Sequence, residues 1–236
     1  MRICALLMAL GAVCLTWFIY EKIKKYSVKA AVIKSIVSVL FIAVALCGWY
    51  QGEGAGEIFG LLFVLGLLFG LLGDIWLDFK YVFPQEDTIF TYAGFCVFGV
   101  GHILFISAML SKYAQPGKEL YVIIPIALAV VLSVGNAFME KPMKLCFGRY
   151  KAIVIAYGVL LFSTMFISGG LCLLYGWQDM TLKLIFIGSI LFTLSDLVLS
   201  GTFFGQGKER PIDIILNYVF YYPAQFLIAL SLLFLK

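Results

Sequence analysis

The sequence predicts an all-α protein, a polytopic transmembrane helical bundle of about eight spans. Its composition is the first indication: 63% of the residues are hydrophobic and only 13% are charged, whereas a soluble domain carries about 25% charged residues. The second is that the apolar residues form continuous runs of about 20 residues, the length that crosses a bilayer as a helix. Continuous runs also exclude an outer-membrane barrel, in which apolar and polar residues alternate. We expect residues 1–236 to form a single integral membrane domain.

Eight apolar runs divide the chain, and short polar connections separate them. They cover residues 3–20, 28–49, 58–79, 89–111, 120–138, 149–174, 181–201 and 211–235. The first run has the position of a signal peptide, but a basic segment rather than a small-residue cleavage site follows it. We therefore interpret this run as the first membrane helix.

Basic residues gather in alternate connections, and this pattern predicts the orientation. Most of the 17 Lys and Arg residues fall on one side: Lys22, Lys24, Lys25, Lys29, Lys34, Lys80, Lys141, Lys144, Arg149, Lys151, Lys208 and Arg210. The positive-inside rule makes that side cytoplasmic and puts both termini outside. Such short loops lean towards a bacterial plasma membrane. The net charge of +4 does not indicate a nucleic-acid partner, because the basic residues lie between membrane spans.

Two aspartates inside apolar runs are the main candidates for function. Asp74 lies in the stretch Leu68–Leu77, and Asp196 lies in the similar stretch Leu194–Leu199. In both, a small residue precedes the aspartate, and two apolar residues and a leucine follow it. A carboxylate in the bilayer core costs about 3 kcal/mol or more, so it should face protein or a wet cavity and serve a purpose. Both runs cross in the same direction, which favours two parallel four-span repeats.

A fainter similarity supports the repeats. Gly101-His102 follows Asp74 by about 28 residues, and Ala224-Gln225 follows Asp196 by about 29. The helical rise of about 1.5 Å per residue places several other polar side chains at similar depths. The first layer, near the cytoplasmic helix ends, contains Lys34, Asp74, Tyr157, Asp196 and Asn217; Tyr221, Tyr222 and Gln225 continue inward, and His102 lies near the middle.

Each of these candidates also has a structural interpretation. Lys34 can extend its ammonium group to the interface without a function. His102 can be a hydrogen-bonded packing group, and Tyr221 and Tyr222 can simply pack. We interpret Asp78, one turn beyond Asp74, as an interfacial loop residue.

Two carboxylates in one apolar site can supply an acid and a base. Close together they cannot both ionise easily, so one keeps its proton while the other stays charged, stabilised by Lys34 or Asn217. The chain has no GxSxG, HExxH or P-loop motif, and its single histidine excludes a multi-histidine metal cluster. We therefore expect no cofactor, although a divalent ion between the two aspartates stays open.

The ordered set of these motifs resembles the YhhN/TMEM86 family of eight-span membrane proteins. The resemblance rests on Lys34, the Leu68–Leu77 stretch, Gly101-His102, Ala156-Tyr157, Gly188–Leu199 and Tyr221-Tyr222 with Gln225. It implies a lysoplasmalogenase, which hydrolyses the vinyl-ether bond of a lysophospholipid to a fatty aldehyde and a glycerophospho-alcohol. Asp74 and Asp196 would be catalytic, and the other polar residues would bind substrate. The alternative is a proton-coupled transporter or a lipid-binding membrane protein that uses the same aspartates.

Overall fold

The computed structural model describes residues 1–24, 28–54, 57–205 and 210–236, and these form an all-helical bundle. Eight helices are long and apolar enough to cross a membrane: α1 (Arg2–Lys24), α2 (Val28–Gln51), α3 (Ile58–Val82), α4 (Asp87–Tyr113), α5 (Leu120–Phe138), α7 (Lys151–Leu174), α8 (Met180–Phe204) and α9 (Pro211–Ser231). Each predicted apolar run is one of these helices, because backbone polar groups in lipid must be satisfied within the segment. The predicted fold class is confirmed.

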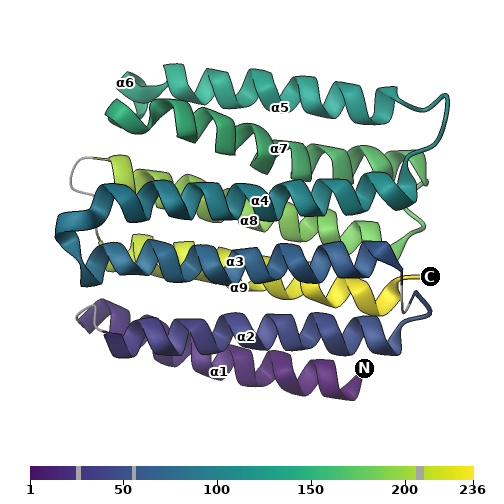
Figure 1. Cartoon of the computed structure of the whole chain (residues 1–236), viewed down its shortest axis with the longest axis horizontal. Helices are drawn as coiled ribbons and strands as arrows, with labels where there is room; N and C mark the ends of the chain where they lie inside the picture. Colours follow the sequence, from purple (N-terminus) through teal and green to yellow (C-terminus); the bar gives the residue numbers. More distant parts are fainter. Residues whose placement is uncertain (25–27, 55–56, 206–209) are drawn as a thin grey trace.

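Short helical segments complete the chain at the helix ends. They are η1 (Pro84–Glu86), α6 (Glu140–Met143), η2 (Gly148–Tyr150) and η3 (Leu232–Phe234). The long helices run side by side, and both termini lie at one end of the bundle (Figure 1). Lys25 and Lys208, two of the basic residues used to predict orientation, lie outside the described residues.

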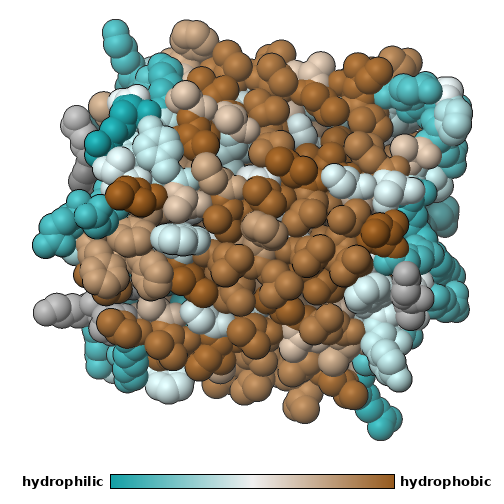
Figure 2. All heavy atoms as spheres, in the orientation of Figure 1, coloured by the Kyte–Doolittle hydropathy of each residue, from teal (hydrophilic) through white to brown (hydrophobic). Residues whose placement is uncertain are grey.

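The surface has the pattern of an integral membrane protein. Hydrophobic side chains form a belt across the middle of the visible face, and hydrophilic side chains lie at its two ends (Figure 2). The belt is formed by exposed apolar residues of several helices, including Val131 of α5 and Leu6 of α1. This chain is therefore an integral, multi-pass membrane protein.

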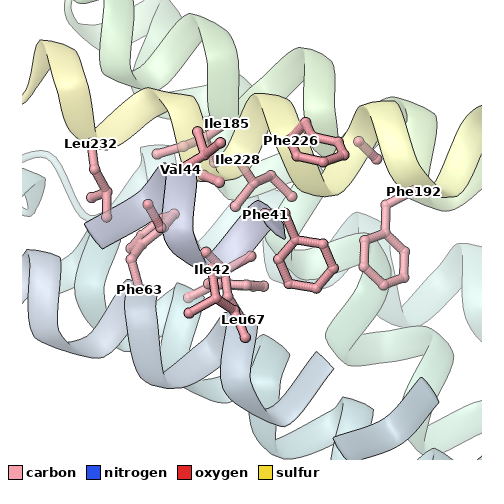
Figure 3. Close-up of a cluster of buried hydrophobic side chains, with 14 of the residues drawn as sticks. Phe41, Ile42, Val44, Phe63, Leu67, Ile185, Phe192, Phe226, Ile228 and Leu232 are labelled. Atoms are coloured by element: carbon pink, nitrogen blue, oxygen red, sulfur yellow. The ribbon is translucent and has the colours of Figure 1, made fainter. Parts of the chain in front are cut away.

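Six of the helices form a closed ring, and the other two pack outside it. Around the ring α2 contacts α3, α3 contacts α4, α4 contacts α7, α7 contacts α8, α8 contacts α9, and α9 returns to α2. Helix α1 packs outside α2 and α9, while α5 packs outside α7. Buried apolar side chains from α2, α3, α8 and α9 fill one part of the interior, with Phe41, Leu67, Ile185 and Phe226 among them (Figure 3).

The contacts among the first four long helices follow nearly the same pattern as those among the last four. The pairs α1–α2, α2–α3, α3–α4 and α2–α9 correspond to α5–α7, α7–α8, α8–α9 and α7–α4, and all eight pairs are in contact. The contact of α1 with α9 is the exception, because α5 and α4 have no contact of that extent. The shared pattern is the one expected of two parallel four-span repeats.

Glycines at equivalent positions let the helices of each half approach closely. Gly66 and Gly188 each precede the aspartate of their half by about two turns. The Gly66 carbonyl oxygen lies 3.1 Å from where a Cβ on Gly101 would be, and the Ala224 carbonyl oxygen lies 3.0 Å from where a Cβ on Gly188 would be. Small residues at such crossings allow backbone contact between membrane helices.

We predict that Gly188→Val lowers the stability of the bundle by about 1–3 kcal/mol, the usual cost of overpacking. The added Cβ would lie 2.7 Å from Ile228 Cγ1, so α8 and α9 must separate. The measurement is the Tm of thermal unfolding in detergent. The control is Gly135→Ala, where the added methyl meets nothing within 4 Å. Equal Tm values for Gly188→Val and the unmodified protein would contradict the close packing.

Candidate functional site

A buried cation from α2 lies between two carboxylates of α3. The Lys34 Nζ is 3.1 Å from Asp74 Oδ1 and 3.1 Å from Asp78 Oδ1, and it also donates to the Asp74 carbonyl oxygen at 3.3 Å. All three side chains are at most 5% exposed. Lys34 therefore does not extend to the interface. It links α2 to α3 as the shared partner of two charges.

The structure corrects the interpretation of Asp78. Helix α3 continues to Val82, so Asp78 is a buried helical residue rather than an interfacial loop residue. Because it follows Asp74 by four residues, the two carboxylates lie on the same helix face. Both therefore reach the Lys34 ammonium group.

Two hydroxyl groups complete the surroundings of Asp74. Ser38 Oγ donates to Asp74 Oδ2 at 2.8 Å, and Tyr221 OH donates to the same oxygen at 3.0 Å. The sequence analysis missed Ser38, although its position one turn after Lys34 on α2 was the available signal. Tyr222 lies behind this cluster, where its hydroxyl donates to the Lys34 carbonyl oxygen at 3.2 Å.

Asp196 on α8 has a different environment. The Tyr157 hydroxyl of α7 donates a hydrogen bond to Asp196 Oδ2. Asp196 is half-buried, whereas Asp74 is 3% exposed. Asn217, considered as a partner for a carboxylate, instead donates to the backbone oxygen and to Oγ of Ser195, both at 3.0 Å.

Each aspartate is bound by a side chain at an equivalent position of the preceding long helix, but the chemical group of that side chain differs. Lys34 precedes Asp74 by 40 residues, and Tyr157 precedes Asp196 by 39. Each partner comes from the helix before the aspartate. The remaining equivalents differ, since Ser38 and Tyr221 of the first site correspond by position to Leu161 and Phe98 of the second. The two carboxylates therefore lie on similar scaffolds, but among the described residues Asp74 has a cationic partner and Asp196 does not.

One pocket of about 130 Å³ brings the two carboxylates together. Of the residues predicted from the sequence, Lys34, Asp74, Tyr157, Asp196, Asn217 and Tyr221 line it. The rest of the wall is mostly apolar, with Phe95, Phe98 and Phe162 among its residues. The pocket combines the charged groups of α2, α3 and α8 with a mostly apolar wall, which suits an amphiphilic ligand.

His102 and Gln225 lie outside this pocket and line a second, much smaller cavity. His102 Nδ1 is 3.0 Å from Thr164 Oγ1, and Gln225 Nε2 donates to the Tyr221 hydroxyl at 3.0 Å. Neither side chain can touch a ligand in the main pocket directly. They connect to the site through other residues.

The connection between α5 and α7 forms one wall of the main pocket. Met143, Leu145 and Phe147 line the pocket from this connection. Glu140 holds it in place, because it accepts hydrogen bonds from the Phe147 backbone N–H at 2.8 Å and from Lys151 Nζ at 2.6 Å. The Lys151 ammonium and this N–H hold the pKa of Glu140 below its usual range.

The residues available to a metal are few. In the described parts of the chain, no group of three or more His, Cys, Asp or Glu side chains is placed to hold a metal ion. Asp74 and Asp78 converge on Lys34, which takes the position that a cation would otherwise occupy.

Comparison with protein families decides the relationship. The family model described as YhhN matches residues 29–232. This chain belongs to the YhhN family. The match includes nearly all of the six-helix ring and leaves out α1, which packs outside it. Searches of curated proteins and of solved structures found no match.

We predict that Lys34→Met destabilises the protein by about 3–5 kcal/mol, because it leaves two buried carboxylates without their counter-ion. The measurement is Tm or denaturant midpoint in detergent. The control is Lys29→Met, whose 2.7 Å ion pair with Glu21 has a 58% exposed lysine and should contribute at most about 1 kcal/mol.

A compensating variant tests the reason for that loss. Replacing Asp74 and Asp78 by Asn in the Lys34→Met background removes the uncompensated charges and should recover part of the stability. If the triple variant is no more stable than Lys34→Met, the ion cluster is not what the lysine stabilises.

Proposed function

We propose that this protein is an intramembrane hydrolase that cleaves the vinyl-ether bond of lysoplasmalogens to a fatty aldehyde and a glycerophospho-choline or -ethanolamine. The observation that carries the proposal is the pair of carboxylates in one pocket with unlike partners. Membership of the YhhN family agrees with it, since the resemblance described above implies this activity. The polar and apolar parts of the pocket suit a lysophospholipid with one chain.

The unlike partners favour a division of roles between the aspartates. Asp74 has the Lys34 ammonium and two hydroxyl donors, all of which stabilise its ionised form. Asp196 has only the Tyr157 hydroxyl as a hydrogen-bond partner among the described residues, and that bond uses Oδ2. Its Oδ1 is left to carry a proton. We assign Asp196 as the general acid and Asp74 as the base.

The steps follow from this assignment. Asp196 gives its proton to the outer alkene carbon, and an oxocarbenium ion forms at the carbon bonded to the ether oxygen. Asp74 stabilises this cation and takes a proton from the water that adds to it, which gives a hemiacetal. Asp74 then protonates the ether oxygen as the C–O bond breaks, while Asp196 takes the hydroxyl proton. Aldehyde and alcohol leave with both aspartates restored.

The charged groups of the pocket limit how it can bind the substrate head group. We assign Lys34 to Asp74 rather than to the substrate phosphate, because two carboxylates already surround its ammonium group. By the positive-inside rule the pocket lies towards the cytoplasmic face of what we take to be a bacterial plasma membrane.

The repeat gives a second candidate some support. Transporters often place substrate and ion sites between two repeats, and buried carboxylates can carry protons. The two functions differ in a simple experiment. A hydrolase releases aldehyde in detergent, whereas transport requires a sealed membrane with two sides. Uptake into proteoliposomes without aldehyde release would favour the transporter.

We predict that Asp74→Asn and Asp196→Asn each lower aldehyde release from lysoplasmenyl-ethanolamine by at least about 10²-fold, the usual contribution of a general acid or base. The assay uses purified protein in detergent, and the saturated alkyl-ether analogue should give no aldehyde. The control is Asp213→Asn, which removes an ion pair outside the pocket, at 2.9 Å from Arg210, whose side chain is 65% exposed. Near-normal rates for either pocket variant, with unchanged Tm, would refute its role.

We also predict that Tyr157→Phe slows turnover by roughly 10- to 100-fold. The hydroxyl stabilises the carboxylate that forms as Asp196 gives up its proton, and a hydrogen bond to a charged group contributes about 1.5–3 kcal/mol. The loss should appear in kcat, since the hydroxyl orients the acid rather than the substrate. Tyr92→Phe is the matched control, because its hydroxyl donates to the Arg149 carbonyl oxygen away from the pocket. A Tyr157→Phe enzyme with normal kcat would remove the tyrosine from the mechanism.

A further inference from the structure

We infer that the small cavity between His102 and Gln225 is a binding site for one ordered water molecule, which joins the two halves of the protein at their pseudo-two-fold axis. The cavity is separate from the pocket proposed as the active site. The inference goes beyond the proposed function, because it depends on the geometry of these two side chains and not on any reaction.

The cavity has the size that one water requires. Its volume is about 10 Å³, and a buried water needs about 10–15 Å³ together with polar partners. Three glycines (Gly66, Gly70 and Gly101) and the rings of Phe98, Phe105 and Phe192 form the rest of its wall. The wall therefore leaves His102 and Gln225 as its polar side chains.

Both side chains have one polar atom without a protein partner. His102 is 2% exposed and Gln225 is 1% exposed. Among the described residues, His102 Nε2 and Gln225 Oε1 have no hydrogen-bond partner. A buried polar group left unpaired loses the hydrogen bond that it makes to water in the unfolded chain. Two such atoms at one cavity point to a ligand that bonds both.

The hydrogen bonds of His102 favour Nε2 as an acceptor. Thr164 Oγ1 lies 3.0 Å from the Leu160 carbonyl oxygen and 3.0 Å from His102 Nδ1. We assign the hydroxyl proton to the carbonyl oxygen, so that the hydroxyl accepts from Nδ1 and the imidazole carries its proton there. In the neutral ring, Nε2 then has a lone pair and no proton.

The hydrogen bonds of Gln225 identify its free atom as an acceptor too. The Tyr221 hydroxyl donates to Asp74 Oδ2, so it must accept from the Gln225 amide nitrogen, which lies 3.0 Å away. The amide oxygen is then the atom without a partner, in a residue that lines the cavity. Two acceptors and no donor are complementary to one water, which donates two protons.

The two groups occupy equivalent places in the repeats. His102 follows Asp74 by about 28 residues on α4, and Gln225 follows Asp196 by about 29 on α9. Their meeting at one cavity is the arrangement that a two-fold axis requires. The water would extend a chain of hydrogen bonds from His102 through Gln225 and Tyr221 to Asp74. Gln225 is then a positioning residue for Tyr221.

The single histidine of the chain makes a direct test possible. Solid-state NMR of protein labelled with ¹⁵N-histidine and reconstituted in lipid reports one imidazole. We expect the neutral ring with its proton on Nδ1, and transfer of magnetisation from a water proton to Nε2. A proton on Nε2, a doubly protonated ring, or no transfer from water would overturn the inference.

Two variants establish the partner of that water. Gln225→Leu removes the amide oxygen, so the Nε2 resonance should shift while the Nδ1 proton stays. If that variant does not fold, Gln225→Met serves, because it keeps a side chain of similar length and lacks the amide oxygen. Gln178→Leu, in the α7–α8 connection, is the control and should leave the spectrum unchanged. A folded Gln225→Leu or Gln225→Met protein with an unshifted Nε2 would refute Gln225 as the partner. The readout needs no turnover, so it stands apart from the hydrolase assays.

Discussion

The ion cluster of Lys34 with Asp74 and Asp78 constrains the rest of the structure. Inside a membrane protein, charges are expensive unless each has a partner. Here one ammonium group serves two carboxylates at 3.1 Å, and Ser38 and Tyr221 supply further hydrogen bonds to Asp74. These partners come from α2 and α9, so the cluster fixes both helices against α3. The position of α3 in turn sets one wall of the pocket.

The duplicated scaffold explains why two carboxylates face one pocket. Equivalent helices carry Asp74 and Asp196, and equivalent helices supply their first partners, Lys34 and Tyr157. The close helix contacts at Gly66 and Gly188 follow the same symmetry. The partners of the two carboxylates are not equivalent. Asp74 has a lysine, a serine and a tyrosine around it. The corresponding positions around Asp196 hold Tyr157, a leucine and a phenylalanine.

The sequence was sufficient for the spans and for the two aspartates, because apolar runs and charges within them are local features. The apolar run at residues 58–79 became α3, and the phrase around Asp196 fell on α8 as expected. The partners were harder to predict. Hydropathy gives the depth of a residue but not the rotation of its helix about the axis, so Ser38 was missed and Asn217 was expected near a carboxylate. Asp78 was misplaced because it lies one residue before the end of the predicted run, whereas α3 continues to Val82.

The contact of α6 and its neighbours with the pocket also escaped prediction, since Met143 and Phe147 lie in a connection with no apolar run. Glu140 holds that connection by hydrogen bonds that only the folded chain creates.

The unequal surroundings of the two halves have a consequence for how such a site can arise. Two identical four-helix units would place identical carboxylates across the axis. These carboxylates would have the same proton affinity, so neither would act only as the acid. Joining the units in one chain lets each acquire its own substitutions. A fused duplication can therefore assign the proton to one side permanently, which a symmetric dimer of a single unit cannot do.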